Sequence, residues 1–92
     1  MPIPTIFNVT CTNANQEYSQ ALPVGTRKIL TRVRGNGTLK VTYTALASGT
    51  AFVSVKSNEA YSDDDIYLES GSCTLYFQSP NAGSIVEIVA WT

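Results

Sequence analysis

Apolar and polar residues alternate along much of this chain, in the pattern that is typical of β-strands. Leu39, Val41 and Tyr43, for example, alternate with hydroxyl-bearing or basic residues, and successive side chains of a strand point to opposite faces. Such runs, rich in Val, Ile, Thr, Tyr and Phe, are separated by stretches of Gly, Asn, Ser, Asp and Pro, which favour turns. The pattern predicts strands over Thr5–Thr12, Glu17–Leu22, Thr26–Arg34, Thr38–Leu46, Thr50–Lys56, Asp65–Glu69, Cys73–Gln78 and Ser84–Trp91.

Seven or eight short strands joined by short turns indicate an all-β domain. We expect a small antiparallel β-sandwich or a jelly-roll-like domain that takes in residues 1–92 as one unit. Residues 1–12 are expected to form either an extended arm or an edge strand of that domain.

The first hairpin that we expect joins the runs Thr26–Arg34 and Thr38–Leu46. Asn36-Gly37 lies between them, and this pair tolerates the positive φ angles of a tight hairpin turn. In the first run, Ile29 lies on an apolar face, whereas Leu30 is an apolar residue on the opposite, basic face. Leu30 is therefore a candidate contact residue.

A second hairpin is expected from Cys73–Gln78 and Ser84–Trp91, because residues 79–83 between them have turn composition. We expect this hairpin at the centre of the domain. Leu75 and Phe77 are expected to face the core. The last strand is largely apolar on both faces: Val86, Ile88 and Ala90 form one, and Ile85, Glu87, Val89 and Trp91 form the other. Such a strand is covered either by a loop of its own chain or by another molecule, and both alternatives are open.

The charge balance gives no broad electrostatic attraction to nucleic acid or to an acidic membrane. The net charge is −1, and only 14% of the residues are charged. The amino-terminal stretch has neither a basic start nor a long apolar run. No segment of the sequence is long and apolar enough to span a bilayer. We therefore expect neither export by an ordinary signal nor a membrane anchor, and a partner that is held by shape and apolar contact.

Histidine, the residue that enzymes use most often as a general base, is missing from the sequence. The chain has no His, which excludes Ser-His-Asp and Cys-His arrangements and most zinc sites, and it contains no glycine-rich nucleotide motif and no CxxC. We expect neither enzyme activity nor a cofactor. Cys11 and Cys73 lie in apolar-rich strand patterns and are interpreted as buried free thiols, with a disulfide between them as the alternative.

Acidic residues concentrate in the stretch EAYSDDDIYLE, which holds Glu59, Asp63, Asp64, Asp65 and Glu69. Several carboxylates together can bind Ca²⁺, but the spacing does not match the loop of a calcium-binding helix pair. We interpret the stretch as a solvated turn whose Asp side chains cap backbone donors, and we assign no metal site.

Aromatic residues support a second functional hypothesis, carbohydrate binding. The chain has five Tyr and one Trp, and aromatic faces stack on sugar rings, although aromatic residues are also enriched in protein interfaces. Tyr61 and Tyr67 are the candidate glycan contacts.

Two blocks of the chain resemble small all-β virion proteins of tailed bacteriophages. They read LPVGTRKILTRVRGNGTLKVTYTA and EAYSDDDIYLESGSCTLYFQSPNAGSIVEIVAWT, about two thirds of the sequence. The shared pattern is a Leu-Pro-x-Gly-Thr turn, an Arg-Gly-x-Gly hairpin, a Tyr-x-x-Asp-Asp-Ile/Val strand entry and Thr-Leu-Tyr-Phe-Gln-Ser-Pro before an apolar strand that ends in Ala-Trp-Thr.

The resemblance implies a non-catalytic head decoration or cement protein, a homotrimer that binds the major capsid protein, assembles in the host cytoplasm and resides in the virion. It does not specify the contact residues. From the strand pattern we expect subunit or capsid contacts at Leu30, Ile85, Val89 and Trp91, with Ile3, Ile6 and Phe7 of the amino-terminal segment reaching for the capsid. A tail-associated carbohydrate-binding β-sandwich module is the alternative function.

Overall fold

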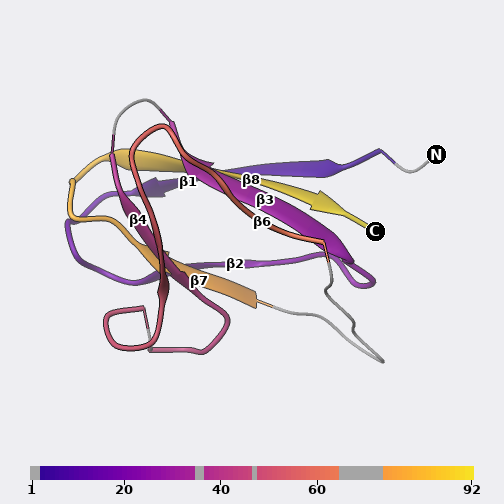
Figure 1. Cartoon of the computed structure of the whole chain (residues 1–92), viewed down its shortest axis with the longest axis horizontal. Helices are drawn as coiled ribbons and strands as arrows, with labels where there is room; N and C mark the ends of the chain where they lie inside the picture. The colour runs from indigo at the N-terminus through magenta and orange to yellow at the C-terminus, as the bar shows by residue number, and fades with distance from the viewer. Residues whose placement is uncertain (1–2, 35–36, 47, 65–73) are drawn as a thin grey trace.

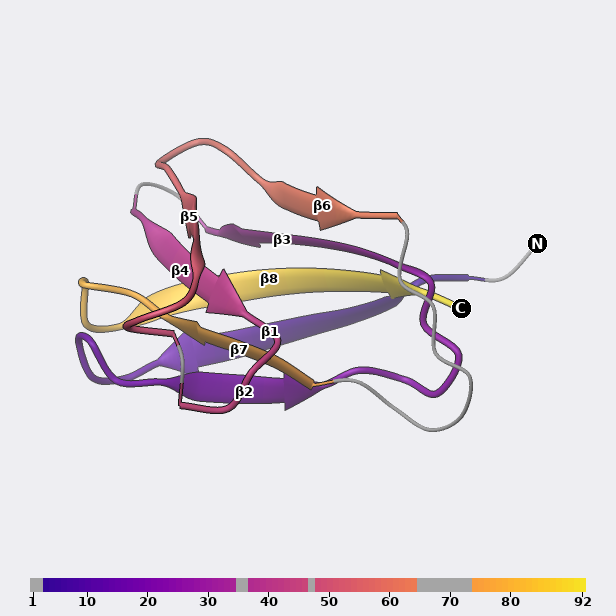
Figure 2. The same ribbon diagram turned by 60° about the horizontal axis from the view of Figure 1, so that its bottom comes forward.

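Two antiparallel four-stranded sheets face each other in the computed structural model (Figures 1 and 2). The structure describes residues 3–34, 37–46, 48–64 and 74–92. Sheet A contains, in spatial order, β1 (Thr5–Cys11), β8 (Ser84–Trp91), β3 (Lys28–Val33) and β6 (Tyr61–Asp63). Sheet B contains, in spatial order, β2 (Tyr18–Ala21), β7 (Thr74–Gln78), β4 (Leu39–Thr42) and β5 (Val53–Val55). The all-β sandwich expected from the sequence is therefore confirmed.

The strand order is that of a jelly roll. β1 pairs with β8, β2 with β7, β3 with β6 and β4 with β5, so the chain resembles one long hairpin that is folded over into two layers. Of the strands in the described ranges, only β4 and β5 are both consecutive in the chain and paired. Every other connection between those strands passes from one sheet to the other.

The two hairpins expected from the sequence are therefore wrong. β3 and β4 lie in different sheets, and so do β7 and β8. A turn composition does not specify whether the next strand pairs in the same sheet or crosses to the other one, and crossing lets both strands bury their apolar faces against each other's layer. The central position expected for the last two strands is correct, since β7 lies between β2 and β4, and β8 lies between β1 and β3.

One strand occupies a stretch that the sequence indicated as a connection. β6 covers Tyr61–Asp63, within the acidic stretch, because the Tyr61 ring packs against the core and the backbone pairs with β3. The predicted strand Asp65–Glu69 lies outside the described residues. β4 is shorter than predicted, and Tyr43 and Ala45, which follow its end, are exposed.

The core lies between the sheets. The large apolar side chains that are fully buried are Ile29, Leu39, Leu75, Phe77, Val86 and Ile88. The inward faces predicted for these strands are therefore correct, and each such side chain contributes about 1.5–3 kcal/mol to the free energy of folding.

Cys11 is a buried free thiol, whereas Cys73 lies outside the described residues. No helix within the described ranges is long and apolar enough to cross a membrane.

Candidate functional site

The outer face of sheet A carries apolar side chains that lie side by side on three neighbouring strands. Ile6 of β1 is paired with Val89 of β8, and Val89 is paired with Leu30 of β3. Their side chains point outward because the residues that alternate with them face the core. Ile6 is 65% exposed, and the other two are partly exposed. We call Ile6, Val89 and Leu30 the apolar row.

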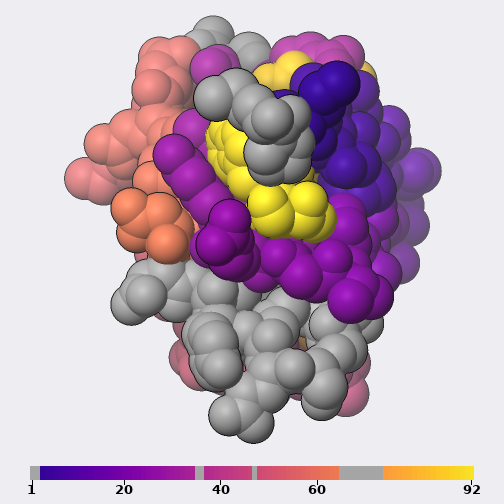
Figure 3. Space-filling model, turned by 90° about the vertical axis from the view of Figure 1, so that its right-hand side faces the viewer, coloured from indigo at the N-terminus to yellow at the C-terminus, as the bar shows by residue number. Residues whose placement is uncertain are grey.

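Trp91 extends this apolar surface toward the end of β8. Its partner across the strands is Lys28, whose ammonium lies 4.9 Å from the centre of the indole ring, within the range of a cation–π contact. The backbone carbonyl of Trp91 accepts a hydrogen bond from the N–H of Arg27 at 2.8 Å. Figure 3 shows the end of β8, in yellow, beside the beginning of β1, in indigo. Trp91 is therefore a fixed, partly exposed aromatic residue of the kind that anchors protein interfaces.

A polar cluster borders the apolar row on its other side. Arg34 Nε donates to Glu87 Oε2 at 2.9 Å, and Arg34 Nη2 donates to Asn8 Oδ1 at 3.2 Å. Arg32 Nε lies 3.6 Å from Glu87 Oε1. These groups separate Ile85 from the apolar row, because Glu87 lies between Ile85 and Val89 on the same face of β8.

The structure brings together most of the contact residues expected from the sequence. Leu30, Val89 and Ile6 form the apolar row, and Trp91 is next to it. Ile3, 88% exposed, precedes β1. The side chain of Phe7 is turned toward the core and partly buried against it, unlike that of Ile6.

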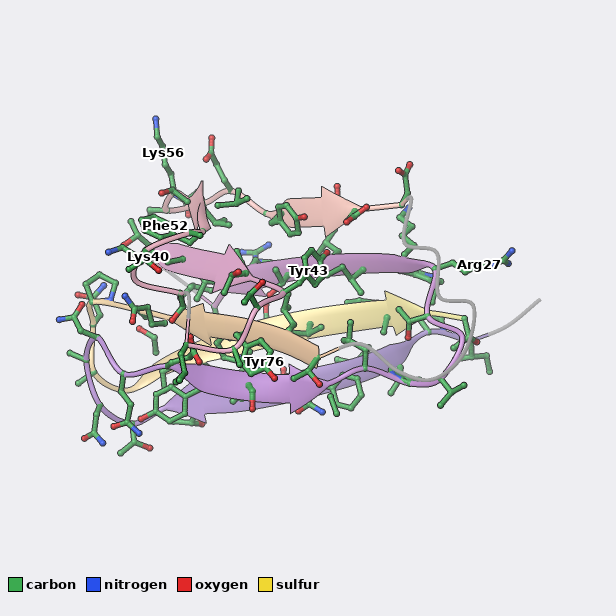
Figure 4. The ribbon with its side chains drawn as sticks, turned by 90° about the horizontal axis from the view of Figure 1, so that it is seen from below. Arg27, Lys40, Tyr43, Phe52, Lys56 and Tyr76 are labelled. Carbon is green, nitrogen blue, oxygen red and sulfur yellow. The ribbon has the colours of Figure 1, made fainter. Side chains whose placement is uncertain are left out.

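An open cleft lies at another part of the molecule, where β4, β5 and β6 meet. Its volume is about 360 Å³. The buried residues Val41 and Leu75 form its base, and Tyr61 comes from β6. Tyr43 and Phe52, labelled in Figure 4, come from the two ends of the β4–β5 connection. The remaining lining residues are Thr42, Ala51 and Val53.

Hydroxyl and carboxylate groups meet beside this cleft. Tyr43 Oη donates to Asp63 Oδ2 at 3.0 Å and lies 3.4 Å from Tyr61 Oη. Desolvation by burial, followed by the hydrogen bonds to Tyr61 and Asp63, raises the pKa of Tyr43 far above its ordinary range, so this phenol stays protonated and remains a donor. Phe52 of the lining has a basic neighbour: Lys40 Nζ lies 4.8 Å from its ring centre, and Figure 4 shows the two side chains next to each other.

The cleft includes one of the two glycan contacts expected from the sequence. Tyr61 lines it, whereas Tyr67 lies outside the described residues. The sequence pattern did not single out Phe52, and it assigned Tyr43 to the apolar face of a strand that in fact ends at Thr42. The signal that could have found both residues is the pair of aromatic residues at the ends of a Ser- and Gly-containing connection.

Glu59 and Asp63, two described residues of the acidic stretch, accept hydrogen bonds. The backbone N–H of Lys56 donates to Glu59 Oε1 at 3.3 Å, which closes the turn before β6, and Asp63 accepts from Tyr43. Among the residues that the structure describes, no group of three acidic or cysteine side chains could hold a metal ion. Asp65 and Glu69 lie outside these residues.

No protein-family model, curated protein or solved structure matches this chain in the three comparisons.

Proposed function

We propose that this chain is a non-catalytic structural protein of a tailed-phage virion, a head decoration protein that associates with copies of itself and stabilises the capsid. The observation that carries the proposal is the apolar row on the outer face of sheet A. The inner faces of both sheets form the core, and the solvent-facing side of an antiparallel sheet is ordinarily polar.

The surroundings of the apolar row suit a subunit interface. Apolar side chains in the middle, an aromatic anchor such as Trp91 and a charged border such as Arg32 with Glu87 are the usual composition of protein interfaces. The trimer is the assembly that the resemblance to phage virion proteins implies. On a capsid, many copies of a weak contact act together, so each copy need not bind tightly by itself.

Self-association is tested by light scattering on the purified protein and on a Val89→Glu variant. We expect an oligomer for the unaltered chain and a monomer for the variant, because a carboxylate in a closed apolar interface loses its hydration. Ser19→Glu, on the exposed side of β2 in the other sheet, is the matched control and is expected to leave the oligomer intact. A monomer at high micromolar concentration before any substitution would contradict the proposal.

The capsid partner is tested by sedimentation with phage heads that lack the protein, taken from the phage that carries the gene. The protein is expected to sediment with the heads at a saturating number of copies, and Val89→Glu is expected to lower that number. Protein that stays in the supernatant at every concentration would overturn the assignment to the capsid, even if the protein is an oligomer.

A further inference from the structure

The cleft between β4, β5 and β6 is separate from the apolar row. The row belongs to the outer face of sheet A, whereas Val41 and Leu75, at the base of the cleft, belong to the core between the sheets. A role for the cleft is therefore independent of self-association. Its chemistry is also different, because aromatic faces stand beside hydrogen-bonding groups instead of beside paired charges.

We propose that this cleft binds an uncharged sugar ring. One face of a pyranose presents C–H groups that pack on an aromatic ring, and its edge presents hydroxyl groups. Phe52, 36% exposed, and Tyr61 are aromatic residues of the lining. The hydroxyl of Tyr61 and the carboxylate of Asp63 both lie beside the hydroxyl of Tyr43, and such groups form hydrogen bonds with sugar hydroxyls.

The groups around the cleft disfavour the other classes of small ligand. A purely apolar ligand would remove water from the Tyr43–Asp63 hydrogen bond without replacing it, which costs free energy. An acidic sugar would place its charge near the Asp63 carboxylate. A cation would be repelled by the ammonium of Lys40, which lies 4.8 Å from the centre of the Phe52 ring. A neutral ligand with one apolar face and hydroxyls along its edge meets none of these costs.

The volume of the cleft and the hydrogen bond beside it indicate the size of the ligand and how little the site must be ordered on binding. Its volume of about 360 Å³ is at the small end of the range of ligand sites, about 300–1,000 Å³, which suits a monosaccharide or a disaccharide. The bond from Tyr43 holds Asp63 in place before the ligand arrives, so that less ordering is needed on binding.

The experiment is an NMR titration of the intact chain with neutral methyl glycosides and disaccharides of glucose, galactose, mannose and N-acetylglucosamine, and with indole as an apolar probe. We expect at least one sugar to shift the amide signals of Ala51, Phe52 and Tyr61. Phe52→Ala and Tyr61→Ala are expected to weaken its binding at least about tenfold, because each removes a stacking surface.

Tyr76→Ala is the matched control. Tyr76 is a partly exposed tyrosine on β7 that does not line the cleft, and Figure 4 labels it, so this variant is expected to bind the sugar as the unaltered chain does. The proposal is overturned if no sugar of the panel shifts the signals at tens of millimolar, if indole alone does, or if Tyr76→Ala weakens binding as much as Phe52→Ala. These outcomes are distinct from a failure of self-association, which light scattering measures on Val89→Glu.

Discussion

Glu17 accepts a hydrogen bond from the backbone N–H of Leu46, with 2.8 Å between Glu17 Oε2 and the nitrogen. The other carboxylate oxygen accepts from the N–H of Ser48 at 3.1 Å. One side chain thus ties the β1–β2 connection to the β4–β5 connection, whose ends supply Tyr43 and Phe52 to the cleft. Desolvation raises the pKa of Glu17, but the hydrogen bonds from Ser48 and Leu46 lower it more, so the net shift is downward.

The first prediction concerns the effect of low pH on the stability that the Glu17 carboxylate provides. Because folding lowers the pKa of Glu17, its stabilising effect is complete above the pKa of the unfolded chain, about 4.3, and is lost as the pH falls through the lower pKa of the folded state. Glu17→Gln is expected to reduce the free energy of unfolding at pH 7 by about 1 kcal/mol. Urea unfolding at pH 7 and at a pH below the folded-state pKa measures this difference, which should shrink in acid. An equal loss at both pH values would show that charge is not involved.

The second prediction concerns the backbone of Leu46. Its φ angle is +64°, and its side chain is 88% exposed, so the strained conformation is not offset by burial. A left-handed conformation costs a residue with a Cβ about 1–2 kcal/mol, and Gly avoids this cost but adds entropy to the unfolded chain. Leu46→Gly is therefore expected to raise the midpoint of thermal unfolding. Leu46→Ala keeps the Cβ and should not do so, and a similar rise in both variants would refute the strain.

The third prediction concerns a hydroxyl in the core. Thr31 is 0% exposed, and its Oγ1 has no hydrogen-bond partner among the described residues. Thr31→Val keeps the shape and removes the unpaired hydroxyl, so it is expected to stabilise the fold by about 1 kcal/mol. Thr26 is the matched control, since it is 1% exposed and its Oγ1 donates to the carbonyl of Pro23 at 2.6 Å. Calorimetry should show Thr26→Val less stable than the unaltered chain, and a loss of stability in Thr31→Val would contradict the prediction.

The fourth prediction separates two neighbours on β1. Phe7 packs against the core, and Ile6 belongs to the apolar row. Phe7→Ser is expected to lower the free energy of unfolding by about 1–3 kcal/mol and to leave the oligomeric state of the folded protein unchanged. Ile6→Ser is expected to weaken the oligomer with little effect on the stability of a subunit. Light scattering and urea unfolding on both variants check this, and the reverse assignment would place Ile6 in the core.

Alternation along the chain predicted which way side chains point, because this depends only on strand geometry. Leu75 and Phe77 are buried, and Leu30 is on the outer face, as expected. Alternation carries no information about which strand is the partner, so the sequence predicts a hairpin of the strands on either side of Asn36-Gly37, whereas β3 and β4 lie in different sheets. The cleft was missed for a related reason. Tyr43 and Phe52 line the same cleft as Tyr61 because the connection between β5 and β6 passes from sheet B to sheet A.

The place of β8 has a consequence for the order of events during synthesis. β8 is the last of the described strands to leave the ribosome, yet it lies between β1 and β3, and Thr5 pairs with Ala90. Pairing over such long separations makes folding slow, and sheet A cannot close until β8 has emerged. We expect ribosome-bound chains that end before β8 to be cut readily by proteases. Because Val89 comes from β8 while Ile6 and Leu30 come from earlier strands, the surface proposed for self-association is incomplete until β8 has been synthesised.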